Sequence, residues 1–594
     1  MSSQLFGTIE EDVAVGEPLA PRWLVDELLR EQQQIAPVAR FARWHDAESD
    51  GAESGDTLVA RHGPANRTEH YRELIPVGLP AAGEQFAFEV DLDACSGCKA
   101  CVTACHNLND LEDGETWRAV GLLHGGSTQS PSLRHVTTAC HHCVDPACLK
   151  GCPVDAYEKD PITGIVRHLD DQCIGCQYCT FMCPYDVPKY SRRLGIVRKC
   201  DMCHTRLAVG EAPACVQSCP SGAIRISIVD RQEAIDNAEA NAFLPGAPEP
   251  GCTLPTTIYK TARPLPTNML PADYFAAAPQ HAHWPLILML VLTQMSVGTF
   301  VAGLWPLGET SVAATFGSSV VHAAAALAIG LLGIGASMRH LGRPLYAFRA
   351  IIGWRRSWLS REIITFGAFA LLAMSIAAWT WATATAQISV DVATSARVSL
   401  ALQIAVCAAG AIGVFCSSMI YAVTQRPFWS LSRTAAKFFL TAAVLGLPAV
   451  LLVGLVVASG MPGLAHADAV RGIGVELLGA IVVAGAAKLV LDASILISGR
   501  ARRHTPLRRT ARLMTGELRR WTWHRFAWGL AGSVVLPGLM YLTQSGPNAG
   551  TLLTSSAIAC VAVGLAATLI GELCERYLFF AAVVAPKMPG APSA

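Results

Sequence analysis

The sequence lacks a recognisable export signal. Its first residues, MSSQLFGTIEEDVAVGEPLAPRW, contain neither a basic start followed by an apolar stretch nor a twin-Arg pair. We therefore expect no secretory or Tat leader. In an exported chain the 21 cysteines would suggest disulfides. Without a leader, and with short regular spacings, they are typical of metal ligands.

Charge is also scarce: Asp, Glu, Lys and Arg make up 15 % of the 594 residues, and hydrophobic residues make up 52 %. These averages conceal a break near residue 284. Before it the sequence is polar and rich in cysteine and proline, and after it long apolar runs alternate with short Arg-rich loops. A chain of this length needs more than one core. We predict a soluble domain followed by a membrane domain.

The soluble part divides into three stretches. Residues 1–85 are a polar extension, with an amphipathic pattern over 23–44, which we expect to pack on the domain or on a partner. Residues 86–230 carry cysteine groups between short strands such as FAFEVDLDA, which predicts two ferredoxin-like units of α+β type, the second inserted in or joined to the first. Residues 231–283 are rich in Pro, Ala and Asn and are expected to be an extended linker, in which the lone Cys252 is not a ligand.

Eight apolar segments beyond residue 284 are long enough to cross a hydrocarbon core of about 30 Å. They lie near 284–304, 316–338, 362–385, 398–424, 437–460, 472–497, 524–543 and 552–574. Small residues are abundant in them, as close helix packing in lipid requires. Residues 284–585 are therefore predicted to form an all-α, eight-helix transmembrane bundle.

Basic residues gather in every second loop between these segments. The loops after the second, fourth and sixth spans hold 18 Arg and Lys residues, including Lys437 and Arg525, whereas the opposite loops hold only Arg397 and Arg471. Loops rich in Lys and Arg stay on the cytoplasmic side. We predict a multi-pass protein of the bacterial inner membrane with the cysteine-rich domain and both termini in the cytoplasm. Nucleic-acid binding is not expected of loops between membrane spans.

Sixteen cysteines fall into four groups of four. The groups are Cys95, Cys98, Cys101 and Cys105; Cys140, Cys143, Cys148 and Cys152; Cys173, Cys176, Cys179 and Cys183; and Cys200, Cys203, Cys215 and Cys219. A 4Fe–4S cube needs four thiolates, of which three close cysteines supply three and the last cysteine of a run serves the other cluster of a pair. Paired CxxC motifs also suit zinc, but CxxCxxCxxxCP is a poor zinc spacing, so we predict iron–sulfur clusters.

None of the four groups has lost a cysteine to another residue type. Each cluster can therefore be a full cube without an open iron. Such a cube transfers single electrons and offers no site to a substrate, which favours an electron wire over a catalytic centre.

The cysteine motifs ACSGCKACVTACHNLNDL, HHCVDPACLKGCP, DQCIGCQYCTFMCPYDVPKY and RKCDMCHTRLAVGEAPACVQSCPSGAI resemble the electron-transfer subunit of dimethyl sulfoxide reductase-type molybdoenzymes. The membrane half, in HWPLILMLVLTQMSVG, SMRHLGRPLYAF, SWLSREI, KFFLTAAVLG and GELCERYLFF, resembles the anchor subunit of the same enzymes. Two subunits would thus be fused in one chain.

The resemblance implies four 4Fe–4S clusters whose ligands cross between the groups. Their ligands would be, in order, Cys95, Cys98, Cys101 and Cys219; Cys105, Cys200, Cys203 and Cys215; Cys140, Cys143, Cys148 and Cys183; and Cys152, Cys173, Cys176 and Cys179. In such enzymes the first cluster lies nearest the catalytic subunit and the last lies nearest the membrane.

The resemblance also implies a quinone site. A His of the HLG motif and a Glu at the start of the next span are implicated in quinol binding in the family, and His340 and Glu362 match them. Ionisable groups at a membrane boundary are costly, and quinone reduction takes up protons, so their chemistry agrees. Alternatively, His340 is a helix-end cation and Glu362 a cap paired with Arg361. Gln294, in the first span, is a further candidate for a hydrogen bond to a quinone carbonyl.

Haem is not expected. His322, His340 and His524 are the candidate ligands, but they form no convincing pair within two spans. The resembled anchor subunits are free of haem.

The soluble part has no room for a pterin-binding region, so substrate chemistry is expected on a separate molybdopterin catalytic subunit. We predict a non-catalytic redox subunit that passes electrons between that partner and membrane ubiquinone or menaquinone. A cytoplasmic placement resembles that of sulfite-oxidising molybdoenzymes and favours sulfite as the electron donor. Reduction of an S- or N-oxide and oxidation of formate are alternatives.

Two other classes are disfavoured. A zinc-binding membrane protein conflicts with the cysteine spacing. A redox-driven ion pump needs several buried carboxylates within the spans, and the charged residues found there, Glu476, Lys488, Asp492 and Glu572, are interpreted as isolated or close to span ends.

Overall fold

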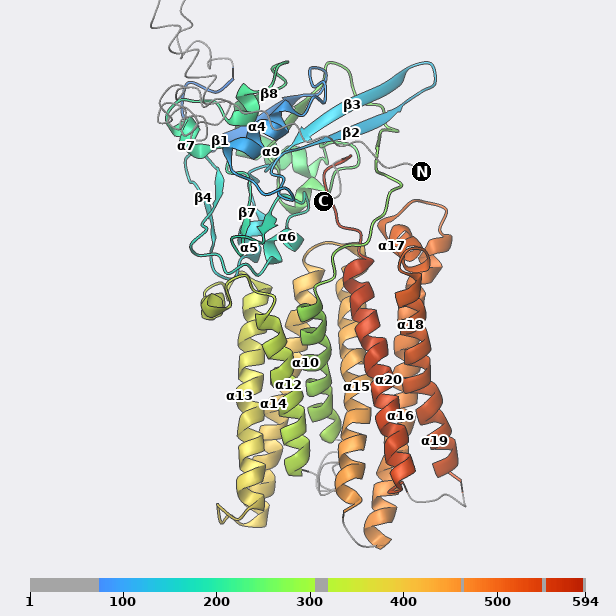
Figure 1. Cartoon of the computed structure of the whole chain (residues 1–594). Helices are drawn as coiled ribbons and strands as arrows, with labels where there is room; N and C mark the ends of the chain where they lie inside the picture. Colours follow the sequence, from blue (N-terminus) through green and yellow to red (C-terminus); the bar gives the residue numbers. More distant parts are fainter. Residues whose placement is uncertain (1–73, 305–318, 461–463, 547–551, 591–594) are drawn as a thin grey trace, which may run out of the picture.

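The computed structural model describes residues 74–304, 319–460, 464–546 and 552–590. Most of the extension 1–85, including the amphipathic stretch 23–44, lies outside these residues. A cysteine-rich domain is stacked on one end of a bundle of long helices (Figure 1), so the predicted fold class is confirmed.

Two three-stranded sheets and two hairpins form the cysteine-rich domain in the described part of the chain. The sheet orders are β8-β1-β9 and β10-β2-β3. The sheet strands are β1 (Glu84–Asp91), β2 (Ala119–Gly126), β3 (Pro131–Thr138), β8 (Ile224–Asp230), β9 (Ile258–Lys260) and β10 (Leu270–Pro271). The hairpins are β4 (Tyr157–Lys159) with β5 (Val166–His168), and β6 (Lys189–Ser191) with β7 (Ile196–Arg198).

Strands β1 and β8 close the domain. They pair antiparallel, from Glu84 opposite Asp230 to Val90 opposite Ile224. They flank the first and the last cysteine group, and both hairpins lie between them in the sequence. The second ferredoxin-like unit is therefore inserted in the first.

In the described part of this domain, five short helices lie within or directly beside the cysteine groups. They are α4 (Ala100–Leu108), α5 (Ala147–Gly151), α6 (Tyr178–Met182), α7 (His204–Ala208) and α8 (Ala214–Gln217). The stretch 231–283, expected to be extended, begins with α9 (Arg231–Glu239) and contains the 3-10 turn η1 (Pro250–Cys252). It then adds β9 and β10 to the two sheets, so it is part of the layered structure.

Eight helices within the described residues are long and apolar enough to cross a membrane. They are α10 (Trp284–Gly303), α12 (Ser319–Met338), α13 (Trp358–Ala384), α14 (Val392–Ala422), α15 (Leu431–Ala458), α16 (Leu464–Ile497), α20 (Ser555–Ala581) and a composite of α18 (Arg519–Leu530), the π-turn η5 (Ala531–Val535) and α19 (Leu536–Gln544). Shorter elements in the loops are η2 (Pro344–Ile351), η3 (Pro427–Trp429), η4 (Ser498–Arg500) and α17 (Pro506–Thr515).

The helices extend beyond several predicted boundaries. Helix α15 begins six residues before Lys437, α18 begins six residues before Arg525, and α20 continues nine residues beyond Glu572. Lys437 and Arg525 were assigned to loops, and Glu572 to a span end. The loop assignments of Lys437 and Arg525 are therefore wrong, because both residues lie within helices.

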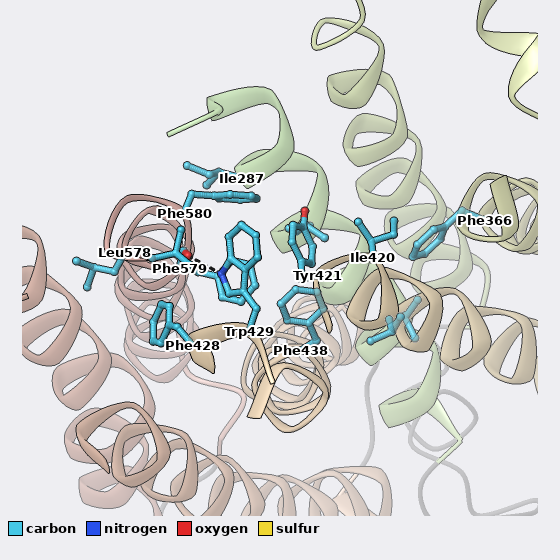
Figure 2. Packing of buried hydrophobic residues seen from close by; sticks show 14 of the residues in the cluster. Ile287, Phe366, Ile420, Tyr421, Phe428, Trp429, Phe438, Leu578, Phe579 and Phe580 are labelled. Atoms are coloured by element: carbon cyan, nitrogen blue, oxygen red, sulfur yellow. Dashed lines mark hydrogen bonds between the residues drawn. The ribbon is translucent and has the colours of Figure 1, made fainter. Parts of the chain in front are cut away.

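Aromatic side chains fill the end of the bundle that faces the cysteine-rich domain. Trp429 stacks on Phe579 with ring centroids 5.2 Å apart and donates its indole N–H to the Phe579 carbonyl at 2.9 Å (Figure 2). Tyr421 and Phe438 pack edge-on against each other in the same cluster. This packing joins η3, α14, α15 and α20.

Candidate functional site

The structure gathers cysteines from different groups around common cavities. Three cavities are each lined by four cysteines: Cys95, Cys98, Cys101 and Cys219 (site 1); Cys140, Cys143, Cys148 and Cys183 (site 3); and Cys152, Cys173, Cys176 and Cys179 (site 4). The remaining four, Cys105, Cys200, Cys203 and Cys215, neighbour one another (site 2). These are the four sets that the resemblance implied.

The loops of sites 1 and 4 are built alike. In the first, Gly97 has φ 75° and Lys99 φ 62°, and in the second, Gly175 has φ 68° and Gln177 φ 60°. Each loop runs into a short helix, α4 or α6. Paired left-handed residues wrap the chain around a centre, and backbone N–H groups then reach the sulfurs, as from Gly175 to Cys173 Sγ at 3.4 Å.

The cysteine sites fit iron–sulfur cubes better than single metal ions. Among the described residues, no three His, Cys, Asp or Glu side chains converge tightly enough to hold one ion. The four cysteines of a site surround a cavity instead, as a cube with one thiolate per iron requires. When bound, such a cube carries one electron at a time.

Buried cations lie between consecutive sites. Arg118, 2 % exposed, faces Cys101 of site 1 and Cys215 of site 2. Lys199, 3 % exposed, has its Nζ 3.6 Å from Cys140 Sγ of site 3 and donates at 2.8 Å to the Cys200 carbonyl of site 2. Burial opposes the charge of Lys199, but the neighbouring cysteine sulfurs outweigh it and raise the Lys199 pKa. The spacing of the cysteine motifs did not predict a role for Arg118 or Lys199.

Site 4 adjoins the helical domain. Arg343 donates its backbone N–H to the Ile174 carbonyl at 3.1 Å, and Tyr178 donates to the Ile420 carbonyl of α14 at 3.2 Å. Cys176 packs against the aromatic core of the bundle. At site 1, by contrast, Cys98 is exposed. The four sites thus form a series from the surface of the cysteine-rich domain to the helices.

His340 follows α12 and lies against site 4. Its ring is 9 % exposed, hydrogen-bonds to the backbone of Cys176 and stands edge-on to His283 at 4.8 Å. Burial lowers the His340 pKa to about 4, which favours the neutral ring over the alternative of a helix-end cation. None of the residues that the structure describes hydrogen-bonds to its buried Nε2.

Glu362, the fifth residue of α13, is 4 % exposed and accepts a hydrogen bond from the Ser417 hydroxyl of α14. Arg361 donates instead to the Trp354 and Arg355 carbonyls. The alternative of a Glu362–Arg361 pair is therefore wrong. Two residues before Glu362, Ser360 donates its hydroxyl to the carbonyl of Pro153, which follows Cys152 of site 4, at 3.5 Å. The start of α13 thus contacts the site that His340 also contacts.

Gln294 lies in α10 and is 1 % exposed. Its Oε1 accepts a hydrogen bond from Arg576 Nη2 at 3.0 Å, and its Nε2 has no partner. The other two histidines considered as haem ligands lie elsewhere in the bundle. His322 packs on Phe300 inside α12, and His524 is exposed on α18.

The charges in the helices are not isolated, contrary to the sequence interpretation. Lys488, Asp492 and Glu572 belong to one buried ion network with partners from α15, α18 and α20. Glu476 is exposed on α16. The pattern ELCER, which puts Glu572, Glu575 and Arg576 on one helix face, was the available signal.

Two families match this chain. A 4Fe-4S dicluster domain matches residues 132–229, and the DMSO reductase anchor subunit (DmsC) matches residues 280–499. Both halves of the resemblance seen in the motifs are therefore confirmed, in the same order along the chain.

Curated relatives match the cysteine-rich part. The B subunit of the anaerobic dimethyl sulfoxide reductase of Escherichia coli (strain K12) is 38 % identical over 154 residues, which are 25 % of this chain and 75 % of that protein. The corresponding subunit from Haemophilus influenzae is 37 % identical over 156 residues, 25 % of this chain and 76 % of that protein. The formate dehydrogenase-O iron-sulfur subunit of E. coli (strain K12) is 29 % identical over 259 residues, 40 % of this chain and 83 % of that protein.

Proposed function

This chain belongs to the dimethyl sulfoxide reductase family of iron–sulfur and membrane-anchor subunits, and on that basis we propose that it relays electrons between a molybdopterin catalytic subunit and membrane quinone. It carries no substrate chemistry of its own. Sites 1 to 4 would hold four 4Fe–4S clusters, and the end of the bundle that faces site 4 would bind the quinone.

The order of the sites carries this proposal. An exposed site 1 offers a contact to a catalytic partner, and site 4 touches the helices through Tyr178 and Arg343. His340 bonds to the Cys176 backbone of site 4, and Glu362 follows Ser360, which donates to the Pro153 carbonyl next to Cys152. Electrons and protons can thus meet at one membrane boundary.

His340 and Glu362 have complementary tasks in quinone turnover. When the His340 ring is neutral, its Nδ1 carries the proton that bonds the Cys176 backbone, so its Nε2 can accept a hydrogen bond from a quinol hydroxyl. Ser417 orients the Glu362 carboxyl, and a carboxyl at this position can exchange a proton with the quinone. The hydrogen bond from the His340 ring to the Cys176 backbone fixes the orientation of the ring relative to site 4.

The loop between α12 and α13 supports a cytoplasmic placement of the cysteine-rich domain. Arg343 and Arg349 of this basic loop donate to the carbonyls of Asp170 and Asp171. Basic loops stay in the cytoplasm, which favours the inner membrane of a bacterium. Sulfite is our leading electron donor on that basis, and S- or N-oxides and formate are the alternatives.

Reduction of the clusters in the purified complex tests the proposal. Sulfite should reduce the clusters, and added decylubiquinone or menadione should reoxidise them, as followed by EPR and visible absorbance. A colourless protein that contains zinc would overturn the cluster assignment. If formate reduces the clusters, or if dimethyl sulfoxide reoxidises dithionite-reduced clusters, then sulfite is not the substrate of the catalytic partner. The proposed electron transfer between that partner and quinone would still stand.

Two variants test the quinone site. His340→Ala and Glu362→Gln should slow reoxidation by quinone while cluster content and reduction by the catalytic partner stay normal. Glu476→Gln is the matched control, because this carboxylate is exposed on α16. Wild-type quinone kinetics in both site variants would show that quinone binds elsewhere.

A further inference from the structure

Seven charged side chains form one network inside the helical bundle. They are Lys437, Lys488, Asp492, Arg525, Glu572, Glu575 and Arg576, and none is more than 4 % exposed. They come from α15, α16, α18 and α20. Neither the cluster sites nor the quinone site described above uses them.

The network is continuous. Lys437 contacts Asp492 at 3.1 Å and Glu575 at 3.0 Å. Arg525 joins Asp492 and Glu572, both at 2.8 Å. Each of these carboxylates is thus shared between cations of different helices.

The network lies within the membrane-spanning part of the bundle. At 1.5 Å per residue, Lys437 is about 9 Å inside the start of α15 and Glu572 about 14 Å inside the end of α20. Ionisable groups at such depth are costly and tend to mark proton or ion pathways. A contribution to folding stability does not explain these buried ion pairs, because apolar residues of similar volume stabilise a protein interior equally well or better.

Charge is unbalanced in this network. Four cations face three carboxylates, which leaves one positive charge in excess. The network therefore becomes neutral when one cation releases a proton. Arginine does not release its proton in proteins, so only the two lysines can do so.

Lys488 is the better placed of the two lysines. Its ion contacts are long, 3.6 Å to Glu572 and 3.8 Å to Glu575, whereas both contacts of Lys437 are close to 3 Å. Lys488 also donates to the Thr441 hydroxyl at 3.0 Å. Its ammonium is thus the least firmly held by carboxylates.

From Thr441 the polar contacts continue toward the quinone site. Arg576 Nη2 lies within hydrogen-bond distance of both Thr441 Oγ1, at 3.2 Å, and Gln294 Oε1. Among the described residues, Nε and Nη1 of Arg576 and Nε2 of Gln294 are buried donors without acceptors. Arg576 lies over the Phe438 ring at 4.2 Å, and Phe438 packs edge-on against Tyr421. Tyr421 lies one turn of α14 beyond Ser417, the hydrogen-bond partner of Glu362.

We propose that this network is a proton donor to the membrane quinone, with Lys488 as the group that releases the proton. The inference rests on the proposed function. Reduction of quinone to quinol consumes two electrons, which arrive through site 4, and two protons. One proton would come from the Lys488 ammonium, which becomes a neutral amine, and the other from the protonated Glu362 carboxyl, which becomes a carboxylate. Both groups are then reprotonated from water. In quinol oxidation the same amine accepts the proton.

Substitution of Lys488 by arginine separates this role from a structural one. Lys488→Arg keeps the positive charge and the ion pairs but cannot release a proton. The complex is reduced with titanium(III) citrate, mixed with decylubiquinone, and followed by stopped-flow absorbance of the clusters. We expect Lys488→Arg and Lys488→Met to slow reoxidation roughly tenfold or more, with unchanged cluster EPR spectra.

Lys437→Arg is the comparison variant, because it makes the same substitution in the same network and so reports the effect of altered packing. It should slow reoxidation less than Lys488→Arg does, and Glu476→Gln, which is exposed on α16 and outside the network, should keep the wild-type rate. Lys488→Arg with the wild-type rate would show that the network is structural. Equal losses in both arginine variants would show that packing, not proton release, limits the rate. Failure of the wild type to be reoxidised by quinone would instead overturn the proposed function itself.

Discussion

At the scale of single residues, the buried cations Arg118 and Lys199 are placed to tune electron transfer. Each lies between two cysteine sites and faces sulfurs of both. A reduced cluster carries one more negative charge than an oxidised one, so a nearby cation stabilises the reduced form. Low solvent exposure strengthens this effect, since water does not screen the charge.

Replacement of Lys199 by methionine should lower the reduction potentials of the clusters at sites 2 and 3. A charge at this distance acts with an energy equivalent to a shift on the order of 100 mV. Redox titration followed by EPR measures it. Lys199→Arg should keep most of the potential, and Lys260→Met is the control, because Lys260 is an exposed partner of Glu89. Unchanged potentials in Lys199→Met would exclude a tuning role.

At the scale of elements, site 4 is positioned by the η2 junction, in which the residues on either side of η2 contact the cysteine-rich domain. Gly342 of the HLG motif meets Gly195 of the β6–β7 hairpin so closely that a Cβ on Gly342 would lie 2.0 Å from the Gly195 carbonyl oxygen. Gly353 donates its backbone N–H to the Pro153 carbonyl at 2.9 Å. Backbone-to-backbone contact of this kind leaves no side chain that could adapt.

Gly342→Ala should therefore push the hairpin away from η2 and displace site 4 from His340. We expect slower reoxidation of the clusters by quinone and a lower midpoint of thermal unfolding. Gly335→Ala, in α12, is the control, because a Cβ there meets no atom within 4 Å. Equal kinetics in the two variants would show that the junction tolerates the displacement.

The same scale shows what the sequence could predict. Apolar runs and cysteine spacing are local signals, so all eight helices and the strands beside the cysteine groups were predicted correctly. Lys437, Arg525 and Glu572 were placed at boundaries because their partners lie on other helices, and no single segment reveals a pair between α16 and α20. Arg118 and Lys199 were missed for the same reason, since their meaning depends on cysteines brought near by folding.

At the scale of the whole molecule, the chain after α20 fastens the helical domain to the cysteine-rich domain. Met588 is 1 % exposed and packs in the core of the cysteine-rich domain. Lys587 pairs with Asp273 at 2.6 Å, and Gly590 donates to the same carboxylate at 3.2 Å. The C-terminal segment lies beside the cysteine-rich domain (Figure 1). These contacts join residues more than 300 positions apart, so no local pattern predicted them.

Met588→Asp should release this segment without unfolding either domain. A buried carboxylate without a partner is costly, but the segment can leave its site, which limits the loss of stability. We expect faster proteolysis after α20 and slower transfer from site 4 to quinone, because the domains are then held mainly by the chain before α10 and by the η2 junction. Met588→Leu, which conserves volume, should behave as wild type. If Met588→Asp resists protease and transfers electrons normally, the η2 junction alone must hold the two domains in register.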